Sequence, residues 1–519
     1  MVPPIAPRVE GGDCLANIVF NEGLVFKKLK SLKAKSSPGP DGLKPVLLTG
    51  LAASIVFPLS VIFEKFFYTK FLPPIWKLAH VKPIFKTGDS SSPKNYRPIS
   101  LTCVLSKTME SIIKDQMSNY LFEKGLISRH QHGFLSGKST CTQLLESIQD
   151  WALSLRSGNS VDVIYIDFSR AFDSIVHSKL LAKLTAYGIG YELHAWIGEF
   201  LAGRQQKVVV DHHFSKTIPV RSGVPQGSVL GPLLFLLFIN DIFDSLPKPV
   251  TAKLFADDVK LYSSVTSKID LVQALKNIEN WSEKWQLKIN ETKSSVLHVG
   301  KGVPGTVYSI AGHTLPIKEM VRDLGIEIDP NLKFSTHIKN IVGKAVRRLG
   351  VLCKAFTCRD PHFMKLAFTT YVRPLLEYCT QIWSPSLIKF IDSIENVQRS
   401  FTRRIPVLKK LSYHDRLAAL NLETLELRRL KFDLIMYFKI IRGLVHVKRE
   451  EFFNFLITLI LQGEMILNLL SPLLKIILCR ICLHGGALAF GTNFPMKWSM
   501  HRLQFLLNIN YKKLISTNI

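Results

Sequence analysis

The sequence predicts an α+β fold, in which strands of an antiparallel sheet are combined with helices. Segments 161–168 and 254–262 are rich in β-branched and aromatic residues and contain aspartates where strands would meet turns. Segment 271–285 instead carries apolar residues at helical spacing. A chain of 519 residues can form roughly three domains with a large buried core.

The segment Leu254–Tyr262 predicts a β-hairpin. Apolar residues flank Asp257 and Asp258, so two short strands joined by a tight turn would place both carboxylates at the tip. Carboxylates in that position could hold Mg²⁺. Aspartates are also ordinary turn residues, so this segment alone leaves both interpretations open.

A further carboxylate comes from a separate segment. Asp167 ends a strand-type run that starts at Val161, and a helix could begin shortly after it. Two hard cations about 3.5 to 4 Å apart need carboxylates from separate segments, because one turn cannot surround both ions and still leave room for substrate phosphates. Asp167 and Asp257 can supply them. Between them, the Gly- and Pro-rich loop 222–232 leads into an apolar helix candidate, Leu233–Phe243.

Three motifs follow one another along the chain. They are Asp167–Asp173 (DFSRAFD), Gly223–Ser228 (GVPQGS) and Phe255–Asp258 (FADD). These motifs resemble motifs A, B and C of reverse transcriptases, in particular those of the jockey-like branch of non-LTR retrotransposons. The resemblance runs from about residue 29 to about residue 450. It implies a right-hand polymerase with fingers, a palm built on an antiparallel sheet, and a helical thumb.

The domain bounds that we expect follow this resemblance. They are an N-terminal extension (1–28), fingers and template-contacting segments (29–155), a palm with motifs A to E and interleaved fingers elements (156–333), a helical thumb or connection (334–450), and an atypical apolar tail (451–519).

The resemblance implies RNA-directed DNA polymerase activity, in which a primer 3′-hydroxyl attacks the α-phosphate of a dNTP. Asp167 and Asp257 would hold two Mg²⁺ ions, for which Mn²⁺ could substitute. The backbone carbonyl of Phe168 would complete the second metal site. Asp258 would assist catalysis, or its side chain would be a structural hydrogen-bond acceptor rather than a ligand.

Residues around the metals have implied roles in nucleotide binding. The ring of Phe172 would collide with a 2′-hydroxyl and so select deoxynucleotides; the alternative is an ordinary core phenylalanine, one of 32 in the chain. Gln226 would reach the nucleotide, and Gly227 would permit a close backbone approach. Lys293, in a segment similar to motif D, would donate a proton to the pyrophosphate leaving group, unless it is only a solvated loop lysine.

Residues 76–101 predict a strand, a turn and a strand with cations at the edges, similar to the fingers hairpin of the family. There Arg97 and Lys86 would contact the triphosphate, or else lie on the surface as ordinary charges. Upstream, residues 29–42 predict a basic helix followed by a breaker-rich loop. In the family such a segment helps to hold the template; the alternative is an ordinary solvated helix end.

The run Gly137-Lys138-Ser139 superficially resembles a phosphate-binding loop, but the first glycine of that motif is absent. We expect instead a helix at Cys141–Leu155 that braces the fingers. Phe134 and Lys138 would then lie near the template.

Residues 337–353 predict a thumb helix with one apolar face formed by Ile338, Ile341, Ala345, Leu349 and Leu352. Four cations lie mostly off this face: Lys339, Lys344, Arg347 and Arg348. They would contact the phosphates of a duplex, or simply form a solvated surface. Before this helix, Asp323–Asp329 resembles the primer-grip hairpin of the family.

The formal net charge of +27 favours a polyanionic partner, although membrane-surface and ribosomal proteins can be as basic. The resemblance implies an RNA template, a DNA primer and dNTPs as partners, and nothing outside the tail suggests a membrane. We expect endonuclease activity to come from elsewhere, because the chain begins close to the fingers.

Eight cysteines without regular spacing, and a start that does not resemble a secretory signal peptide, predict an intracellular protein without disulfides. The resemblance places it in a cytoplasmic ribonucleoprotein and in the nucleus. Cys479, Cys482 and His484 resemble half a zinc site, but no second pair follows at a useful spacing, so we interpret them as incidental.

Two rival interpretations remain open. A viral RNA-dependent RNA polymerase shares the palm but is not expected to keep a bulky Phe172 under the sugar. A non-catalytic, nucleic-acid-binding relic of a decayed element would keep the basic surface without turnover, whereas intact motifs A, B and C favour chemistry.

The tail 451–519 departs from the family. Residues 456–483 are apolar enough to suggest a membrane helix, which three residues interrupt: Glu464, Pro472 and Lys475. Segments 462–468 and 490–499 can each be written in codons that encode other amino acids when read in a shifted frame. In the same shifted frame, both then give amino-acid strings similar to the usual C-terminal segment of the family. We therefore expect a single-base insertion or deletion between Phe453 and Gln462, and a tail without a coherent core. The nucleotide sequence of the gene tests this.

Overall fold

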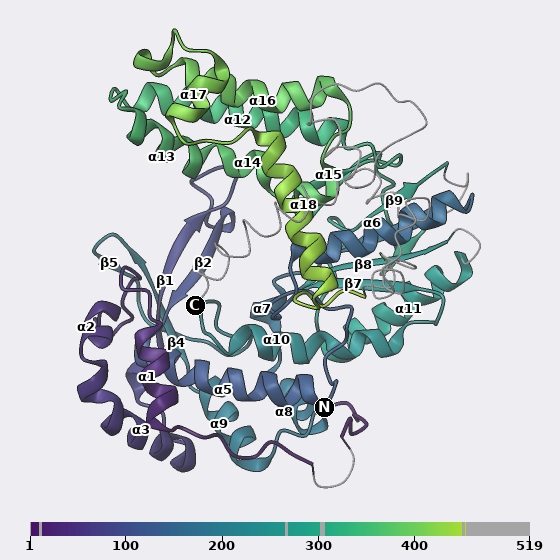
Figure 1. Cartoon of the computed structure of the whole chain (residues 1–519). Coiled ribbons are helices and arrows are strands. Elements are labelled where there is room, and N and C mark those ends of the chain that lie inside the picture. The colour runs from purple at the N-terminus through teal and green to yellow at the C-terminus, as the bar shows by residue number, and fades with distance from the viewer. Residues whose placement is uncertain (1, 10–12, 265–267, 302–306, 449–451, 453–519) are drawn as a thin grey trace, which may run out of the picture. The chain divides into compact units, whose positions relative to one another are not determined.

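The computed structural model describes residues 2–9, 13–264, 268–301, 307–448 and 452. The chain divides into two units, residues 1–452 and 453–519, and all described residues belong to the first. The expected frameshifted tail therefore lies outside the described residues, except for Phe452. Within the first unit, helices and small sheets alternate along the chain (Figure 1).

A four-stranded antiparallel sheet carries two of the three sequence motifs. Its order is β7 (Thr251–Phe255), β8 (Asp258–Ser264), β3 (Val161–Ile166) and β9 (Ser295–Val299). β3 pairs with both β8 and β9, and most of its side chains are buried, which suits its β-branched sequence. The two predicted strand-type segments are therefore confirmed, and they are neighbours in one sheet.

Two helices pack against this sheet. α6 (Thr140–Arg156) contacts β3 and β7, and α11 (Lys268–Trp285), a helix that the spacing of apolar residues predicted, contacts β8. The indole of Trp151 in α6 is fully buried and meets the Tyr262 ring of β8 edge-on at 5.7 Å. α6 also packs against α15 (Thr380–Trp383), and the expectation that this helix braces the fingers stays a prediction.

A second sheet contains the predicted hairpin. β1 (Leu78–Phe85) and β2 (Tyr96–Leu101) are antiparallel. β1 also pairs with β4 (Gln205–Val210), and this pair is parallel, which the sequence did not predict. A parallel pair needs a long crossover, which the helical segment between β2 and β4 provides. Two short strands complete the sheet: β5 (His213–Phe214) and β6 (Ile218–Pro219).

The rest of the N-terminal half is largely helical. Its helices are α1 (Glu22–Lys30), α2 (Pro45–Gly50), α3 (Ala52–Thr69), α4 (Pro74–Lys77), α5 (Val104–Glu123), α7 (Ala171–Ser174), α8 (His177–Ala186), α9 (Tyr191–Leu201) and α10 (Gly231–Ile239). This half also contains the short 3₁₀ helices η1 (Pro93–Asn95) and η2 (Asn240–Ser245).

The basic helix expected at the start of residues 29–42 lies further toward the N-terminus, as α1, and the loop follows it. α1 ends at Lys30, and residues 31–36 form turns and bends. The Asn21 side chain accepts a hydrogen bond from the Leu24 N–H (2.9 Å) and so caps the start of α1. The apolar face of α1 is buried, whereas the Lys- and Ser-rich run that follows offers no comparable face to bury.

Among the described residues, one helix, α3, is long and apolar enough to cross a membrane. This is weak evidence, because a helix in a protein core passes the same test. Phe63 and Phe67 of α3 are fully buried, and both rings contact the Phe20 ring, with centroids 6.1 and 5.7 Å away.

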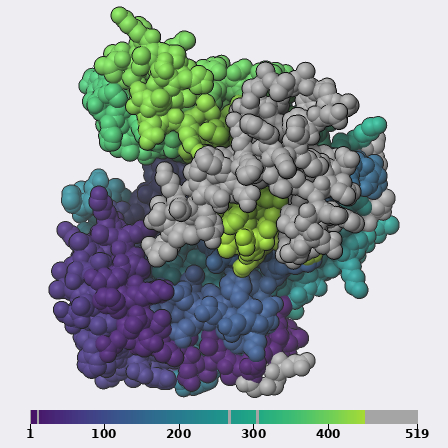
Figure 2. Space-filling view, viewed as in Figure 1, coloured from purple at the N-terminus to yellow at the C-terminus, as the bar shows by residue number. Residues whose placement is uncertain are grey.

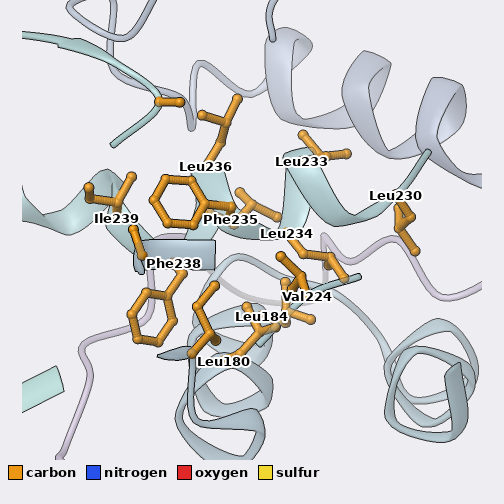
Figure 3. Packing of buried hydrophobic residues seen from close by; sticks show 14 of the residues in the cluster. Leu180, Leu184, Val224, Leu230, Leu233, Leu234, Phe235, Leu236, Phe238 and Ile239 are labelled. Atoms are coloured by element: carbon orange, nitrogen blue, oxygen red, sulfur yellow. The ribbon is translucent and has the colours of Figure 1, made fainter. Parts of the chain in front are cut away.

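α10 forms the centre of a large apolar core. Figure 3 shows its side chains together with Leu180 and Leu184 of α8 and with Val224 from the loop before α10. Full burial of a leucine or phenylalanine contributes roughly 1.5–3 kcal/mol relative to exposure. The predicted helix Leu233–Phe243 is confirmed in its first part, and the chain continues as η2. This core anchors both ends of the Gly-rich loop.

Residues 335–441 form a group of helices, green to yellow-green in Figure 1. They are α12 (Ser335–Ala355), α13 (Pro361–Tyr371), α14 (Arg373–Glu377), α15 (Thr380–Trp383), α16 (Ile388–Arg403), α17 (Tyr413–Ala419) and α18 (Leu425–Ile441), with the 3₁₀ turn η4 (Pro406–Leu408). The predicted apolar face of α12 is confirmed, because all five of its residues are buried: Ile338, Ile341, Ala345, Leu349 and Leu352. The hairpin predicted before it is also present, as β12 (Val321–Asp323) and β13 (Ile326–Ile328).

His337 connects the start of α12 to this hairpin. The residue is 4% exposed, and its Nδ1 accepts a hydrogen bond from the Glu327 N–H (3.3 Å). Burial lowers the pKa of His337 from 6.5 to about 4; Glu327 opposes this shift, and Lys344 and Arg322 add to it. The folded chain therefore keeps this ring neutral at pH values where the unfolded chain protonates it.

We expect the free energy of unfolding to fall as the pH drops from 6.5 to about 4, by up to about 3 kcal/mol from His337 alone. The sign follows because the unfolded chain binds the extra proton in this range. His337→Gln should flatten this part of the stability curve, whereas His362→Gln, exposed on α13, should not. Chemical denaturation at several pH values measures the effect, and identical pH dependence in His337→Gln and wild type would contradict it.

Candidate active site

The hairpin of β7 and β8 turns at Ala256 and Asp257. Phe255 pairs with Asp258 across this turn, so the predicted tight hairpin is confirmed. Asp257 lies in the turn itself, whereas Asp258 is the first residue of β8. Ala256 has a φ of +58°, a conformation that glycine, asparagine or aspartate adopts more often than alanine in two-residue turns.

Gln131 holds this turn in place. Its side-chain oxygen accepts hydrogen bonds from the N–H groups of Ala256 (3.0 Å) and Gly133 (2.8 Å), and its amide nitrogen donates to the Ala256 carbonyl (3.4 Å). Gln131 is 1% exposed, so a fixed amide compensates for the unusual backbone of Ala256. Sequence reasoning missed Gln131, because no local pattern connects it to a turn 125 residues away.

The end of β3 brings Asp167 beside the hairpin. The strand register pairs Ile166 with Val259, which directly follows the aspartate pair. Asn290 donates from its side chain to Asp167 Oδ2 (3.1 Å) and from its backbone to the Asp167 carbonyl (2.7 Å). Lys293 Nζ lies 3.5 Å from the same Oδ2. Asn290 thus orients Asp167, a role that the sequence motif did not reveal.

The aspartates act on one another electrostatically. Burial raises the pKa of Asp257; the Asp167 charge adds to the shift, and Arg97 opposes it. Burial also raises the pKa of Asp258 to about 6, with repulsion from Asp257, Asp323 and Asp167 adding to it. Asp258 is exposed in part, so its carboxylate stays partly hydrated. Negative charge is therefore concentrated here, and Arg97 and Lys260 offset only part of the rise in pKa.

This donor set fits a hard divalent cation. Carboxylates from two segments meet where their like charges repel, and a dication would relieve that repulsion. Asp167 and Asp257 would hold it, with Asp258 beside them. In the described parts of the chain, no group of three or more His, Cys, Asp or Glu side chains could hold a metal ion. Other ligands would then come from the backbone and from substrate phosphates, as Mg²⁺ commonly requires.

The Gly-rich loop contacts the first motif directly. The Gln226 side-chain amide donates to Asp173 Oδ1 (2.7 Å), and the Ser222 hydroxyl donates to the Asp173 carbonyl (2.8 Å). Gly227 has a φ of +117°, and a Cβ there would lie 2.2 Å from the Ser100 carbonyl oxygen. A close backbone approach at Gly227 is thus present, but with β2 of the protein. Contact of Gln226 or Gly227 with a nucleotide stays a prediction.

Phe172 lies between two other aromatic rings. It stacks on Phe235 of α10, with centroids 4.2 Å apart and planes 16° from parallel, and Phe134 meets it edge-on at 6.0 Å. Phe172 is half-buried, so part of its ring packs against the core and part remains exposed. Its role in sugar selection stays a prediction.

The cations predicted to bind phosphates take different positions. Arg97 is exposed on β2, and its charge opposes the rise in the pKa of Asp257. Lys86 is exposed just after β1, and its N–H donates to the Asn95 carbonyl (2.8 Å). Among the described residues, no ion pair joins Lys86 to the aspartates.

Lys138 and Ser139 belong to the start of α6. Ser139 caps the helix together with Thr142, so the Gly-Lys-Ser run is a helix start here. The Lys138 ammonium donates to the Arg129 carbonyl. Burial lowers the pKa of Lys138 to about 8, and Glu146 opposes the shift. Contact with a template would require the ammonium to leave that carbonyl, and it stays a prediction.

The four cations predicted on the thumb helix are exposed along α12: Lys339, Lys344, Arg347 and Arg348. The Arg348 guanidinium also donates to the Tyr371 carbonyl (3.1 Å). Their contact with nucleic acid stays a prediction.

Glu110 of α5 supports the Gly-rich loop from the core side. Its Oε2 accepts hydrogen bonds from the N–H groups of Val229 (2.8 Å) and Leu230 (3.2 Å), which directly precede α10. Glu110 is 1% exposed. Burial raises its pKa, and Arg204 lowers it. In the sequence Glu110 is only one polar position on a helix, so no signal pointed to it.

The site combines aspartates from two segments at one end of a sheet with a Gly-rich loop and an exposed arginine. This combination is typical of one class of enzymes. Such sites transfer phosphoryl or nucleotidyl groups with the help of divalent cations. The sequence comparisons narrow this class to one family.

Residues 84–332 match the family model described as reverse transcriptase (RNA-dependent DNA polymerase). Over 73% of its length the chain is 28% identical to the probable RNA-directed DNA polymerase from transposon BS of Drosophila melanogaster, covering 44% of that protein. It is also 28% identical, over 73% of its length, to the RNA-directed DNA polymerase from mobile element jockey of the same species, covering 43% of it. The chain spans less than half the length of these relatives.

Residues 84–332 therefore match the reverse transcriptase family model, and all three sequence motifs lie within this range. The resemblance to the jockey-like branch of non-LTR retrotransposons is confirmed.

Proposed function

We propose that this chain is an RNA-directed DNA polymerase, which extends a primer 3′-hydroxyl with dNTPs along an RNA template. The observation that carries the proposal is that Asp167 and Asp257 lie close together within the matched range, where burial and the Asp167 charge both raise the pKa of Asp257. The domains would be arranged as a right hand, with fingers at 29–155, a palm at 156–333 and a thumb at 334–450.

Reverse transcriptases generally depend on divalent metals. Bound Mg²⁺, or Mn²⁺ in its place, would activate the primer hydroxyl and neutralise charge on the triphosphate. Asp167 and Asp257 would hold the two ions, the Phe168 carbonyl would complete the second site, and Asp258 would add negative charge beside them. Asn290 keeps the Asp167 carboxylate in one orientation.

The remaining residues would bind and select the nucleotide. Arg97 and, further out, Lys86 would hold the triphosphate, because both are exposed near the turn of the β1–β2 hairpin. Phe172 would lie beneath the sugar, held in one plane by Phe235. Lys293, exposed and 3.5 Å from Asp167, would donate a proton to the leaving pyrophosphate.

The nucleic acid would be held mainly by charge. Gln226 and Gly227 would face the nucleotide from the Gly-rich loop, and Lys138 would contact the template. The exposed cations of α12 would contact the phosphates of the primer–template duplex.

Primer extension on a heteropolymeric RNA template tests this function. With a DNA primer and Mg²⁺, the purified chain should add dNTPs in the order that the template dictates and should use NTPs poorly. Preferential incorporation of NTPs would favour an RNA polymerase. Tight binding without incorporation would favour the non-catalytic relic.

The support that Glu110 gives the Gly-rich loop leads to a separate prediction. We expect Glu110→Gln to raise the KM for dNTP in this assay more than it lowers kcat, because the loop that carries Gln226 loses a charged acceptor. The lost charge-assisted hydrogen bonds should also cost about 1.5–3 kcal/mol of stability.

Steady-state kinetics and thermal melting of the same preparation measure both effects. Glu64→Gln, an exposed position on α3, is the matched control and should change neither. Lowered stability with an unchanged KM would show that Glu110 supports only the fold.

A further inference from the structure

A hollow of about 500 Å³ lies on the exposed side of α16. Five residues line it: Asn396, Arg399, Ser400, Arg403 and Arg404. The first four recur at helical spacing, so their amide, hydroxyl and guanidinium groups share one face of the helix. The other face of α16 carries Ile394, Val397 and Phe401, which are at most 2% exposed. The polar face is therefore left to solvent.

The charged side chains that line this hollow are all arginines, so its charge is positive. Arg399 lies 3.5 Å from Asp392 in an exposed pair, and its guanidinium lies over the Tyr413 ring at 5.2 Å. In the described part of the chain, Arg403 and Arg404 have no ion-pair partner. The nearby Glu395 is buried and accepts hydrogen bonds from the Tyr413 hydroxyl and the Leu425 N–H, so it does not neutralise them.

We propose that this hollow binds the phosphate backbone of nucleic acid, as a second site besides the cations of α12. Guanidinium forks match phosphate oxygens in a bidentate geometry. Asparagine and serine side chains add donors of the kind that commonly contact the backbone without reading bases. The ligand is therefore recognised by charge and not by sequence; its identity as nucleic acid rests on the proposed function.

The position of α16 supports this assignment. α16 packs against α12, so both helices belong to the same group, which Figure 2 shows in green on the viewed face. A nucleic acid longer than one binding site can contact both helices. Lys409 and Lys410 follow on the exposed side of η4 and extend the positive charge.

Binding of a blunt RNA–DNA hybrid to the full chain, measured at several salt concentrations, tests the proposal. Arg403→Gln/Arg404→Gln should weaken binding by about tenfold near 0.1 M salt and reduce the slope of log affinity against log salt by about two. Lys65→Gln/Lys248→Gln removes the same charge from exposed positions outside this group of helices and should leave the slope unchanged. Arg403→Lys/Arg404→Lys keeps the charge and should restore most of the slope.

Three outcomes would overturn the proposal. One is an unchanged slope in the folded Arg403→Gln/Arg404→Gln chain, with folding checked by circular dichroism. Another is an equal loss of slope in Lys65→Gln/Lys248→Gln, which would indicate a general charge effect. The third is a loss of binding to phosphatidylserine vesicles with hybrid binding intact, which would assign the hollow to a lipid surface. Because binding requires no catalysis, a chain that fails to extend primers still gives a clear result here.

Discussion

Replacing Asp257 with asparagine should reduce RNA-templated primer extension by at least about a thousandfold, because a neutral amide is a poor ligand for a hard dication that stabilises the transition state by several kcal/mol. The affinity for primer–template should stay nearly unchanged, since cations elsewhere would supply the phosphate contacts. Single-turnover extension and equilibrium binding of the same preparation measure the two quantities. Near-normal extension would contradict the assignment of Asp257 to the metal site.

A matched control exists in the turn between β4 and β5. Asp211 is exposed there with a φ of +51°, a conformation that asparagine also tolerates. Asp211→Asn makes the same chemical change away from the carboxylates and should leave extension unaltered.

Phe172→Val should raise the incorporation of ribonucleotides relative to deoxynucleotides by roughly tenfold to a hundredfold, the range that steric changes in a pocket produce. The smaller side chain opens the space that a 2′-hydroxyl would need, while deoxynucleotides still fit. The structure adds a cost in stability of about 1–3 kcal/mol, since the ring stacks on Phe235 at 4.2 Å. Competition between dNTPs and NTPs measures the selectivity.

Phe172→Tyr keeps the ring and its bulk, so it should retain discrimination against ribonucleotides. If Phe172→Val loses stability but keeps its selectivity, Phe172 is only a core residue.

Elements with a strong local pattern could be predicted from the sequence. The strand ending at Asp167 and the hairpin around Asp257 were found because β-branched, apolar and turn residues agree there. The apolar face of α12 was found because five apolar residues recur at helical spacing. Contacts between segments far apart in the sequence could not be predicted in this way. The parallel pairing of β1 with β4, and the packing of α6 against the four-stranded sheet, depend on which surfaces the chain brings together.

The residues that position the site were the least predictable. Gln131, Asn290 and Glu110 each act through hydrogen bonds to backbone or carboxylate groups more than 100 residues away. Their own neighbourhoods look like ordinary loops and helices. The motifs reveal the residues that would touch the metals, whereas the groups that orient those residues become visible only in the folded chain.

The most direct test of the proposed activity is the addition of dTTP to oligo(dT) annealed to poly(rA) by the purified full chain. The proposal predicts incorporation that requires Mg²⁺ or Mn²⁺ and that disappears in Asp167→Asn. A correctly folded preparation that binds this primer–template but adds no nucleotide with either metal would contradict it.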